Sequence, residues 1–264
     1  MQRIRANGIS FTCSIDGAEG APWVTFSNSL NTNYSSWDGQ VGRFGDRYRI
    51  LRYNTRGHDG TEAPPEPWEL EDLASDVVAL WDALGIDKSH FVGLSIGGMT
   101  GQALALGWQD RIRSLVLADT RADFTGEFAQ FMPRMIARVE AEGLGSLIEG
   151  MPARWLTPEV VKTRPDLVER VRAMIATNTV EGYVGCARAI TRLDFMDRLS
   201  EIKLPTLLIC GAQDLGTPIS GMREMQKRIA GSRYVEIDPA GHLSNIENPD
   251  AFDSVLAKFL DAQP

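Results

Sequence analysis

The pentapeptide Gly93-Leu94-Ser95-Ile96-Gly97 places a serine between two glycines in a G-x-S-x-G pattern. An apolar run at residues 90–94 leads into it, and a segment rich in Gly, Ala and Leu at 96–107 follows it. A strand-to-helix turn of this kind holds the serine on a tight bend, where small neighbours leave room for the backbone. The free N–H groups at the start of the helix favour negative charge there. The pattern predicts that Ser95 is a nucleophile.

A serine nucleophile needs an adjacent base, and the chain has three histidines, His58, His90 and His242. His90 begins the strand that leads to Ser95, so it lies at the opposite edge of the sheet, and we interpret it as structural. His58 follows an earlier strand at the correct edge, in TRGHDG, where a structural hydrogen-bonding role is the simpler interpretation. His242 follows the last predicted strand and is preceded by small residues, which suit a loop that presents an imidazole. We therefore predict that His242 is the base.

An acid must orient the imidazole and stabilise its charged form. Asp214 follows one apolar strand in the segment GAQDLGTP, and Asp119 follows another, so Asp119 is the alternative. The chain order Ser95, Asp214, His242 agrees with one known order for such triads, which favours Asp214. Two backbone N–H groups should bind the oxyanion: that of Ile96, directly after the nucleophile, and one from the loop after the strand at 23–26.

The segments that must position these residues alternate between strand-like and helix-like patterns. Such alternation predicts βαβ units and a mostly parallel sheet, and its apolar strands indicate a sheet covered on both faces. The predicted strands are 9–15, 23–26, 48–53, 90–94, 114–118, 204–211 and 234–237, and the predicted helices are 70–84, 96–107, 218–230 and 249–260.

Residues 124–199 show helical periodicity only, and they predict a helical cap inserted into a core made of residues 1–123 and 200–264. The two parts are expected to form one integrated domain, since no change in composition separates them. Pro133 falls on an apolar helical face of the cap, so we expect a helix to start or kink there.

Composition excludes several other classes of protein. The 264 residues carry 27 Lys and Arg against 35 Asp and Glu, and a net charge of −8 disfavours a nucleic-acid binder. The three cysteines are widely spaced, as expected for free thiols in a reducing compartment. No apolar run has the length of a signal peptide or a membrane span, so we expect a cytoplasmic protein without membrane contact. No metal-ligand cluster or phosphate-binding loop is recognisable, and no cofactor is expected.

Further segments carry a family resemblance that runs over nearly the whole chain. They are FSNSLNTNYSSWDGQ at 26–40, RYNTRGH at 52–58, PARWLTPE at 152–159, EGYVGCARAI at 181–190 and AGHLSNIENPDAF near the end. Together with the serine motif they resemble the α/β-hydrolase superfamily, and within it the 3-oxoadipate enol-lactonases of aromatic-compound degradation. The resemblance implies an α/β-hydrolase fold. It also implies hydrolysis of a five-membered enol-lactone, which bears a carboxylate, to 3-oxoadipate.

The chain departs from the family pattern at two places, and its oxyanion loop differs from that of many hydrolases of the same fold. Many hydrolases of this fold carry His-Gly in the oxyanion loop. Alignment on Trp37 places Asn28 and Ser29 at those positions, and the matching donor is then the N–H of Leu30. Asn31 stands where the family usually has Gly, and Asn54 where it usually has Asp.

The resemblance also suggests how the substrate is held. Arg154 and Trp155 match an Arg-Trp pair of the family, and we hypothesise that they line the pocket. Arg154 would bind the carboxylate with two hydrogen bonds and Trp155 would cover the ring. Arg134 and Arg138 are the alternatives for the carboxylate.

Other activities share this fold and triad, so motifs alone leave them open. They are a broad carboxylesterase, another lactonase, a carbon–carbon bond hydrolase and, from another class, a non-catalytic ligand receptor. A haloalkane dehalogenase or epoxide hydrolase is disfavoured, because those enzymes use an Asp nucleophile and position 95 is Ser.

Overall fold

The computed structural model describes residues 1–263. An eight-stranded sheet runs through the molecule in the order β1-β2-β4-β3-β5-β6-β7-β8. β2 pairs antiparallel with β1 and β4, and the other neighbours are parallel. The strands are β1 (Gln2–Ala6), β2 (Ile9–Gly17), β3 (Trp23–Ser27), β4 (Arg49–Tyr53), β5 (Ser89–Leu94), β6 (Ile112–Ala118), β7 (Thr206–Gly211) and β8 (Arg233–Ile237). The predicted α/β class and mostly parallel sheet are confirmed.

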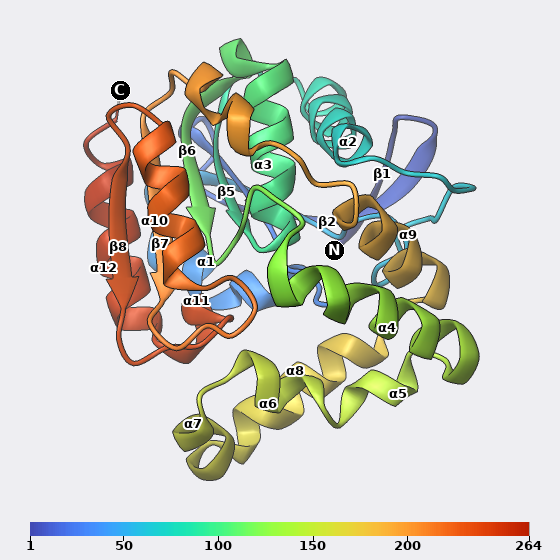
Figure 1. Ribbon diagram of the computed structural model, residues 1–264. Coiled ribbons are helices and arrows are strands. Elements are labelled where there is room, and N and C mark those ends of the chain that lie inside the picture. The colour runs from blue at the N-terminus through green and yellow to red at the C-terminus, as the bar shows by residue number, and fades with distance from the viewer. Residues whose placement is uncertain (264) are drawn as a thin grey trace.

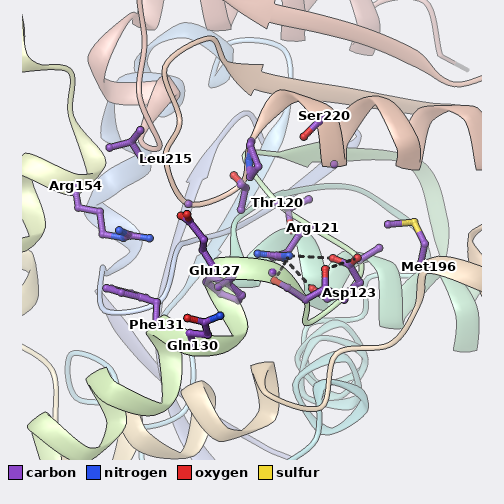
Figure 2. Close-up of a pocket in the computed structure, with 18 of the residues that line it drawn as sticks. Thr120, Arg121, Asp123, Glu127, Gln130, Phe131, Arg154, Met196, Leu215 and Ser220 are labelled. Atoms are coloured by element: carbon purple, nitrogen blue, oxygen red, sulfur yellow. Dashed lines mark hydrogen bonds and ion pairs between the residues drawn. The ribbon is translucent and has the colours of Figure 1, made fainter.

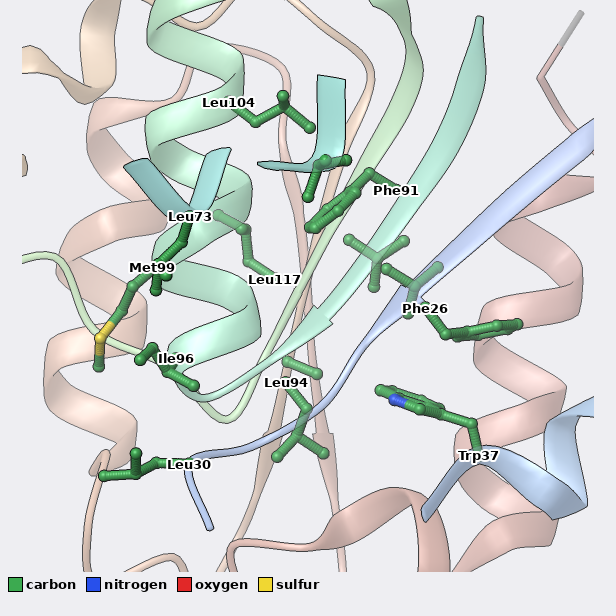
Figure 3. Packing of buried hydrophobic residues seen from close by; sticks show 14 of the residues in the cluster. Phe26, Leu30, Trp37, Leu73, Phe91, Leu94, Ile96, Met99, Leu104 and Leu117 are labelled. Carbon is green, nitrogen blue, oxygen red and sulfur yellow. The ribbon is translucent and has the colours of Figure 1, made fainter. Parts of the chain in front are cut away.

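Helices cover both faces of the sheet. α2 (Leu70–Ala83) packs beside α3 (Ile96–Gly107), and α1 (Asp38–Phe44) packs beside α12 (Pro249–Leu260). Every residue of β5 and β7 is buried, as their continuous apolar sequences require. Figure 3 shows side chains of α2 and α3 on one side of these strands and Trp37 on the other. α10 (Ile219–Arg228) and α11 (Ser244–Glu247) complete the α-helices outside the 124–199 segment. Three short 3-10 helices lie at Tyr34–Trp37, Gln109–Arg111 and Met196–Glu201.

Between β6 and β7 the chain forms six α-helices, which we call the cap helices. Figure 1 shows α4 to α8 gathered at one side of the sheet. Apart from one isolated bridge between Asp123 and Asp194, this segment holds no strand pairing. The cap helices are α4 (Gly126–Glu142), α5 (Gly145–Ile148), α6 (Met151–Trp155), α7 (Pro158–Thr163), α8 (Pro165–Ala176) and α9 (Val180–Ile190). The division at residues 124 and 199 stays a prediction.

Two elements differ from the sequence-based expectation. β1, with the sequence QRIRA, was not predicted, because it is a largely exposed edge strand without an apolar run. α4 begins at Gly126 and passes through Pro133, so a helix start at Pro133 is wrong, and the alternative of a kink there stays a prediction. Pro133 lies on the exposed face of α4, where water can satisfy the backbone carbonyl that loses its helical donor.

In residues 1–263 no helix combines the length and apolar character needed to cross a bilayer. Cys13, Cys186 and Cys210 are all buried and free.

Candidate active site

Ser95 lies on the turn between β5 and α3 in a strained backbone conformation. Its φ of 59° and ψ of −116° are unusual for a residue with a side chain. Two hydrogen bonds hold the turn: Ser95 N–H donates to the Ala118 carbonyl at 2.9 Å, and Thr120 Oγ1 donates to the Ser95 carbonyl at 2.7 Å. The end of β6 therefore helps to keep Ser95 in this conformation.

The glycines of the motif are required by close backbone contacts. A Cβ at Gly93 would lie 2.1 Å from the Gly97 carbonyl oxygen, and a Cβ at Gly97 would lie 2.3 Å from the Ser27 carbonyl oxygen. A side chain at Gly93 would therefore force the start of α3 away from β5, and one at Gly97 would force the turn away from β3.

The structure brings His242 and Asp214 into contact. His242 Nδ1 lies 2.8 Å from Asp214 Oδ2, so Nδ1 carries the proton and Nε2 is the ring nitrogen left for chemistry. Ser95 and His242 line the same cavity. Since Ser95, Asp214 and His242 follow β5, β7 and β8, the parallel strands deliver all three to one edge of the sheet.

Asp214 is held as an anion by its donors. Oδ1 accepts hydrogen bonds from Gly216 N–H at 2.7 Å and Thr217 N–H at 3.1 Å, and Oδ2 accepts one from Thr217 Oγ1. Burial alone would raise the pKa of Asp214, but His242 and these donors hold that pKa below its usual value. Burial conversely would lower the pKa of His242, yet the Asp214 carboxylate raises it above the usual value.

Asp119, the alternative acid, has other partners. Its Oδ1 accepts Gly211 N–H at 2.6 Å, and its Oδ2 accepts Ser244 Oγ. Burial, reinforced by the nearby Asp214 carboxylate, raises the pKa of Asp119 to about 8. The geometry therefore pairs the imidazole with Asp214 rather than with Asp119.

The loop expected to bind the oxyanion is held from behind by His58. Asn31 N–H donates to His58 Nε2 at 3.1 Å, and His58 Nδ1–H donates to the Arg56 carbonyl at 2.8 Å. Burial lowers the pKa of His58 to about 4, so the ring is neutral and can accept this bond. Ile96 is the first residue of α3, so its N–H has no acceptor within the helix.

The side chains of the two asparagines that depart from the family pattern both form hydrogen bonds. Asn31 has a φ of 64°, a conformation that asparagine tolerates better than most residues, and its Oδ1 accepts Asn178 Nδ2 from the cap at 3.2 Å. Asn54 Oδ1 accepts Tyr34 N–H at 2.7 Å, while its Nδ2 donates to the Asp59 carbonyl at 3.1 Å. Asn54 is thus both acceptor and donor, which an aspartate anion could not be.

Cap residues close the cavity that contains Ser95. The Trp155 ring lies 6.3 Å from the His242 ring, inclined by 30°. The Arg154 guanidinium lies over the Phe131 ring at 3.8 Å, and among residues 1–263 it has no carboxylate partner within ion-pair distance. The cavity is lined by Ser29, Leu30, Ser95, Met99, Phe128, Phe131, Met132, Met151, Arg154, Trp155, Tyr183, Ile190, Gly216, Thr217 and His242.

A larger cavity of about 590 Å³ adjoins this one between α4 and the loop before α10 (Figure 2). Arg154 and Phe131 line both cavities, so they stand at the boundary. Arg134 lines only the larger cavity. Arg138 lines neither and pairs instead with Glu142 at 3.2 Å. Arg154 is therefore the arginine best placed for an anion bound beside Ser95.

The sequence matches the alpha/beta hydrolase fold family over residues 22–249. The chain belongs to this family. It is 35% identical to 3-oxoadipate enol-lactonase 2 of Acinetobacter baylyi, over 96% of this chain and 94% of that protein. Its fold superimposes on the crystal structure of the enol-lactonase from Burkholderia xenovorans with a TM-score of 0.95, at 37% identity, covering 98% of this chain and 100% of that one. A malate-bound thermophilic esterase from Thermogutta terrifontis is similar at 28% identity and a TM-score of 0.91, covering 99% and 98%.

These similarities confirm the expected family resemblance. They also indicate that the protein is a hydrolase. Sequence reasoning did not assign Phe128 or Phe131 to the site, because their helical spacing is equally typical of a core face. The contact of the Phe131 ring of α4 with Arg154 of α6 appears only in the tertiary structure.

One cluster of metal-ligand side chains is present among residues 1–263: atoms of Asp119, Cys210 and Asp214 lie within 4.8 Å of one another. The carboxylate oxygens of both aspartates already accept hydrogen bonds. Burial also raises the pKa of the Cys210 thiol, which keeps it in the protonated form that binds metals poorly. The donor set therefore does not fit a metal centre.

Proposed function

We propose that this α/β hydrolase opens an anionic five-membered enol-lactone, 3-oxoadipate enol-lactone, to 3-oxoadipate, as a step in the degradation of aromatic compounds. The observation that carries this proposal is Arg154. Its guanidinium lines the cavity that holds Ser95 and His242 and has no carboxylate partner among residues 1–263. The names of the two enol-lactonase relatives support the same substrate class.

In the first half of the reaction Ser95 Oγ attacks the lactone carbonyl carbon while His242 Nε2 takes the hydroxyl proton. The negative charge on the carbonyl oxygen would be bound by the N–H groups of Leu30 and Ile96. The ring C–O bond then breaks, and the leaving enol oxygen receives the proton from His242. The enol tautomerises to the ketone, while the acyl group stays on Ser95.

In the second half a water molecule attacks the acyl-enzyme carbonyl and gives its proton to His242. The Ser95–acyl bond breaks, Ser95 Oγ takes that proton, and the free acid leaves. Asp214 stabilises the imidazolium in both halves through the 2.8 Å contact with Nδ1. The chemistry thus uses only groups that the chain and water supply.

Substrate selection is assigned to Arg154 and Trp155. Burial lowers the pKa of Arg154, but an arginine side chain stays charged at neutral pH and can bind a carboxylate with two hydrogen bonds. The Trp155 ring, beside His242, would cover the lactone ring. The similar Thermogutta terrifontis esterase has a structure with malate, a dicarboxylate, bound.

The test compares 3-oxoadipate enol-lactone with a neutral ester, 4-nitrophenyl acetate, for the wild type and three variants. Ser95→Ala should abolish turnover of both substrates. Arg154→Ala should raise KM for the lactone roughly ten- to hundredfold, the value of a charge-assisted hydrogen bond of about 1.5–3 kcal/mol, while leaving ester turnover nearly unchanged. Arg138→Ala, whose arginine pairs with Glu142 away from both cavities, is the matched control.

Each result has a separate meaning. Ester cleavage that depends on Ser95, without turnover of the lactone, would overturn the substrate and leave the serine mechanism standing. An unchanged lactone KM in Arg154→Ala would overturn the role of Arg154. Residual activity equal to the wild type in Ser95→Ala would overturn the nucleophile.

A further inference from the structure

The loop that carries His242 is bound to the cap through its backbone. His242 N–H donates to the Trp155 carbonyl at 2.8 Å, and Leu243 N–H donates to the same oxygen at 3.3 Å. A Cβ at Gly241 would lie 2.6 Å from that oxygen, so the two segments approach as closely as glycine allows. Arg154, the substrate-binding candidate, precedes Trp155 directly.

Glu247 joins the same two segments from the other side. Its Oε2 accepts Gly241 N–H at 2.7 Å, from the histidine loop. Its Oε1 accepts Thr157 N–H at 2.8 Å and also Thr157 Oγ1, from the cap. Among residues 1–263 Glu247 has no Lys or Arg within ion-pair distance, so its carboxylate serves only these three donors.

We propose that Glu247 is a positioning residue that holds the His242 loop against the Arg154–Thr157 segment of the cap. The proposal rests on the proposed function only in taking His242 as the base. The Glu247 carboxylate then fixes the position of the His242 loop relative to the Arg154–Thr157 segment. This segment of the cap is expected to stay next to His242 during turnover.

An ionised carboxylate suits this position because both of its oxygens meet N–H donors. A glutamine has one acceptor oxygen and one NH2 group. Its NH2 group would therefore point at the N–H donor of either Gly241 or Thr157. Glu247→Gln therefore keeps the size of the side chain but breaks either the link to Gly241 or the link to Thr157.

Variants on each side of the link test the proposal. Glu247→Gln should lower kcat for 4-nitrophenyl acetate roughly ten- to hundredfold, a typical loss when a reacting group is displaced by about 1 Å. Thr157→Val, which removes the hydroxyl on the cap side, should lower kcat in the same direction. Thr157→Ser keeps the hydroxyl and should restore it. In the double variant the loss should be smaller than the product of the two single losses, because both act on one link.

The pH profile distinguishes positioning from a general loss of stability. The acid limb of kcat/KM reports the protonation of His242 in the free enzyme. If the loop loosens, the contact between Asp214 and His242 weakens and the acid limb of Glu247→Gln moves to lower pH. The matched control is Glu159→Gln, an exposed glutamate on α7 that loses the same charge near the same segment.

A lower melting temperature for Glu247→Gln with kcat and the acid limb equal to those of Glu159→Gln would overturn the proposal. So would strictly multiplicative losses in the double variant. Failure of the proposed function would be seen separately in the wild type, as cleavage of 4-nitrophenyl acetate without turnover of the enol-lactone.

Discussion

Asp119 and Asp214 follow the neighbouring strands β6 and β7, and their different donors give them different chemistry. Asp214 accepts four hydrogen bonds and stays ionised beside His242, whereas Asp119 accepts two and has its pKa raised to about 8 by burial and by Asp214. One carboxyl thus supports the charge on His242, and the other is retained as a neutral acid at neutral pH. Each assignment predicts a distinct mutational result.

Asp214→Asn should reduce kcat by on the order of 10³–10⁴, as loss of a triad acid does in other hydrolases. Because the Asp214 carboxylate raises the pKa of His242, its removal should lower that pKa and move the acid limb of kcat/KM to lower pH. Initial rates with 4-nitrophenyl acetate across the pH range measure both effects. A variant with wild-type kcat and an unmoved acid limb would remove Asp214 from the mechanism.

Asp119→Asn should keep kcat within a few-fold of the wild type. The amide oxygen can accept from Gly211 N–H, and the Ser244 hydroxyl, which donates to the Asp119 carboxyl, can rotate to accept from the amide NH2 group. In the folded state the pKa of Asp119 is about 8, above its unfolded value, so the folded state holds this proton while the unfolded state releases it. The contribution of Asp119 to stability is therefore present below pH 4 and lost as the pH rises toward 8. The stability of Asp119→Asn relative to the wild type should increase over that window.

Urea unfolding of both proteins at several pH values between 4 and 8 measures this difference. A relative stability that is constant or falls with pH would contradict the neutral acid, and a loss of kcat as large as that of Asp214→Asn would make Asp119 part of the triad.

At the scale of elements, the loop after β3 is held in place by hydrogen bonds from other segments. The loop after β3, expected to supply the Leu30 donor, is held by the neutral His58 ring through Asn31 N–H. The same loop contacts the cap through Asn178. A displaced oxyanion donor typically costs far more activity than stability.

His58→Gln and His58→Leu separate these effects. The Gln Oε1 can replace Nε2 as the acceptor for Asn31 N–H, so this variant should keep kcat within a few-fold of the wild type. Leu removes the acceptor and should reduce kcat by roughly tenfold or more, since loss of a single oxyanion donor costs about 10²–10³. Steady-state kinetics at pH 7, with melting temperatures recorded in parallel, give the comparison. Equal kcat values for the two variants would show that the loop needs no acceptor at position 58.

At the scale of the whole molecule, the cap is joined to the core by contacts too close for larger residues. A Cβ at Gly182 of α9 would lie 2.3 Å from the Gly57 carbonyl oxygen, in the loop after β4. The Thr179 N–H donates to the same oxygen at 3.1 Å. Helix α9 is therefore docked backbone to backbone, next to the His58 loop.

Gly182→Ala should lower the free energy of unfolding by about 1–3 kcal/mol, the usual cost of overpacking, because neither backbone can withdraw without losing hydrogen bonds. Gly145→Ala on α5 is the control, since its Cβ would meet nothing within 4 Å. Urea denaturation of the three proteins measures the difference. A Gly182→Ala variant as stable as the control would show that the cap can shift on the core at little cost.

The local sequence pattern was sufficient to predict those helices and turns whose structure is determined within one segment. Residues 96–107 and 249–260 form helices at the predicted limits, because their periodicity and their terminal residues act within the segment. The serine motif contains a local requirement too, since a Cβ at Gly93 would collide with the Gly97 carbonyl oxygen of the same turn. Parallel strand order then implied that Ser95, Asp214 and His242 would meet at one edge.

Tertiary structure decided what depends on segments that are distant in sequence. The pairing of His242 with Asp214, rather than with Asp119, depends on where the end of β7, the loop after β8 and the start of α11 place Gly211, His242 and Ser244. The placing of Phe131 against Arg154, and of Glu247 between Gly241 and Thr157, requires the cap to be packed on the core. Such contacts join side chains whose separation is set by packing and not by spacing along the chain, so no pattern within one segment could predict them.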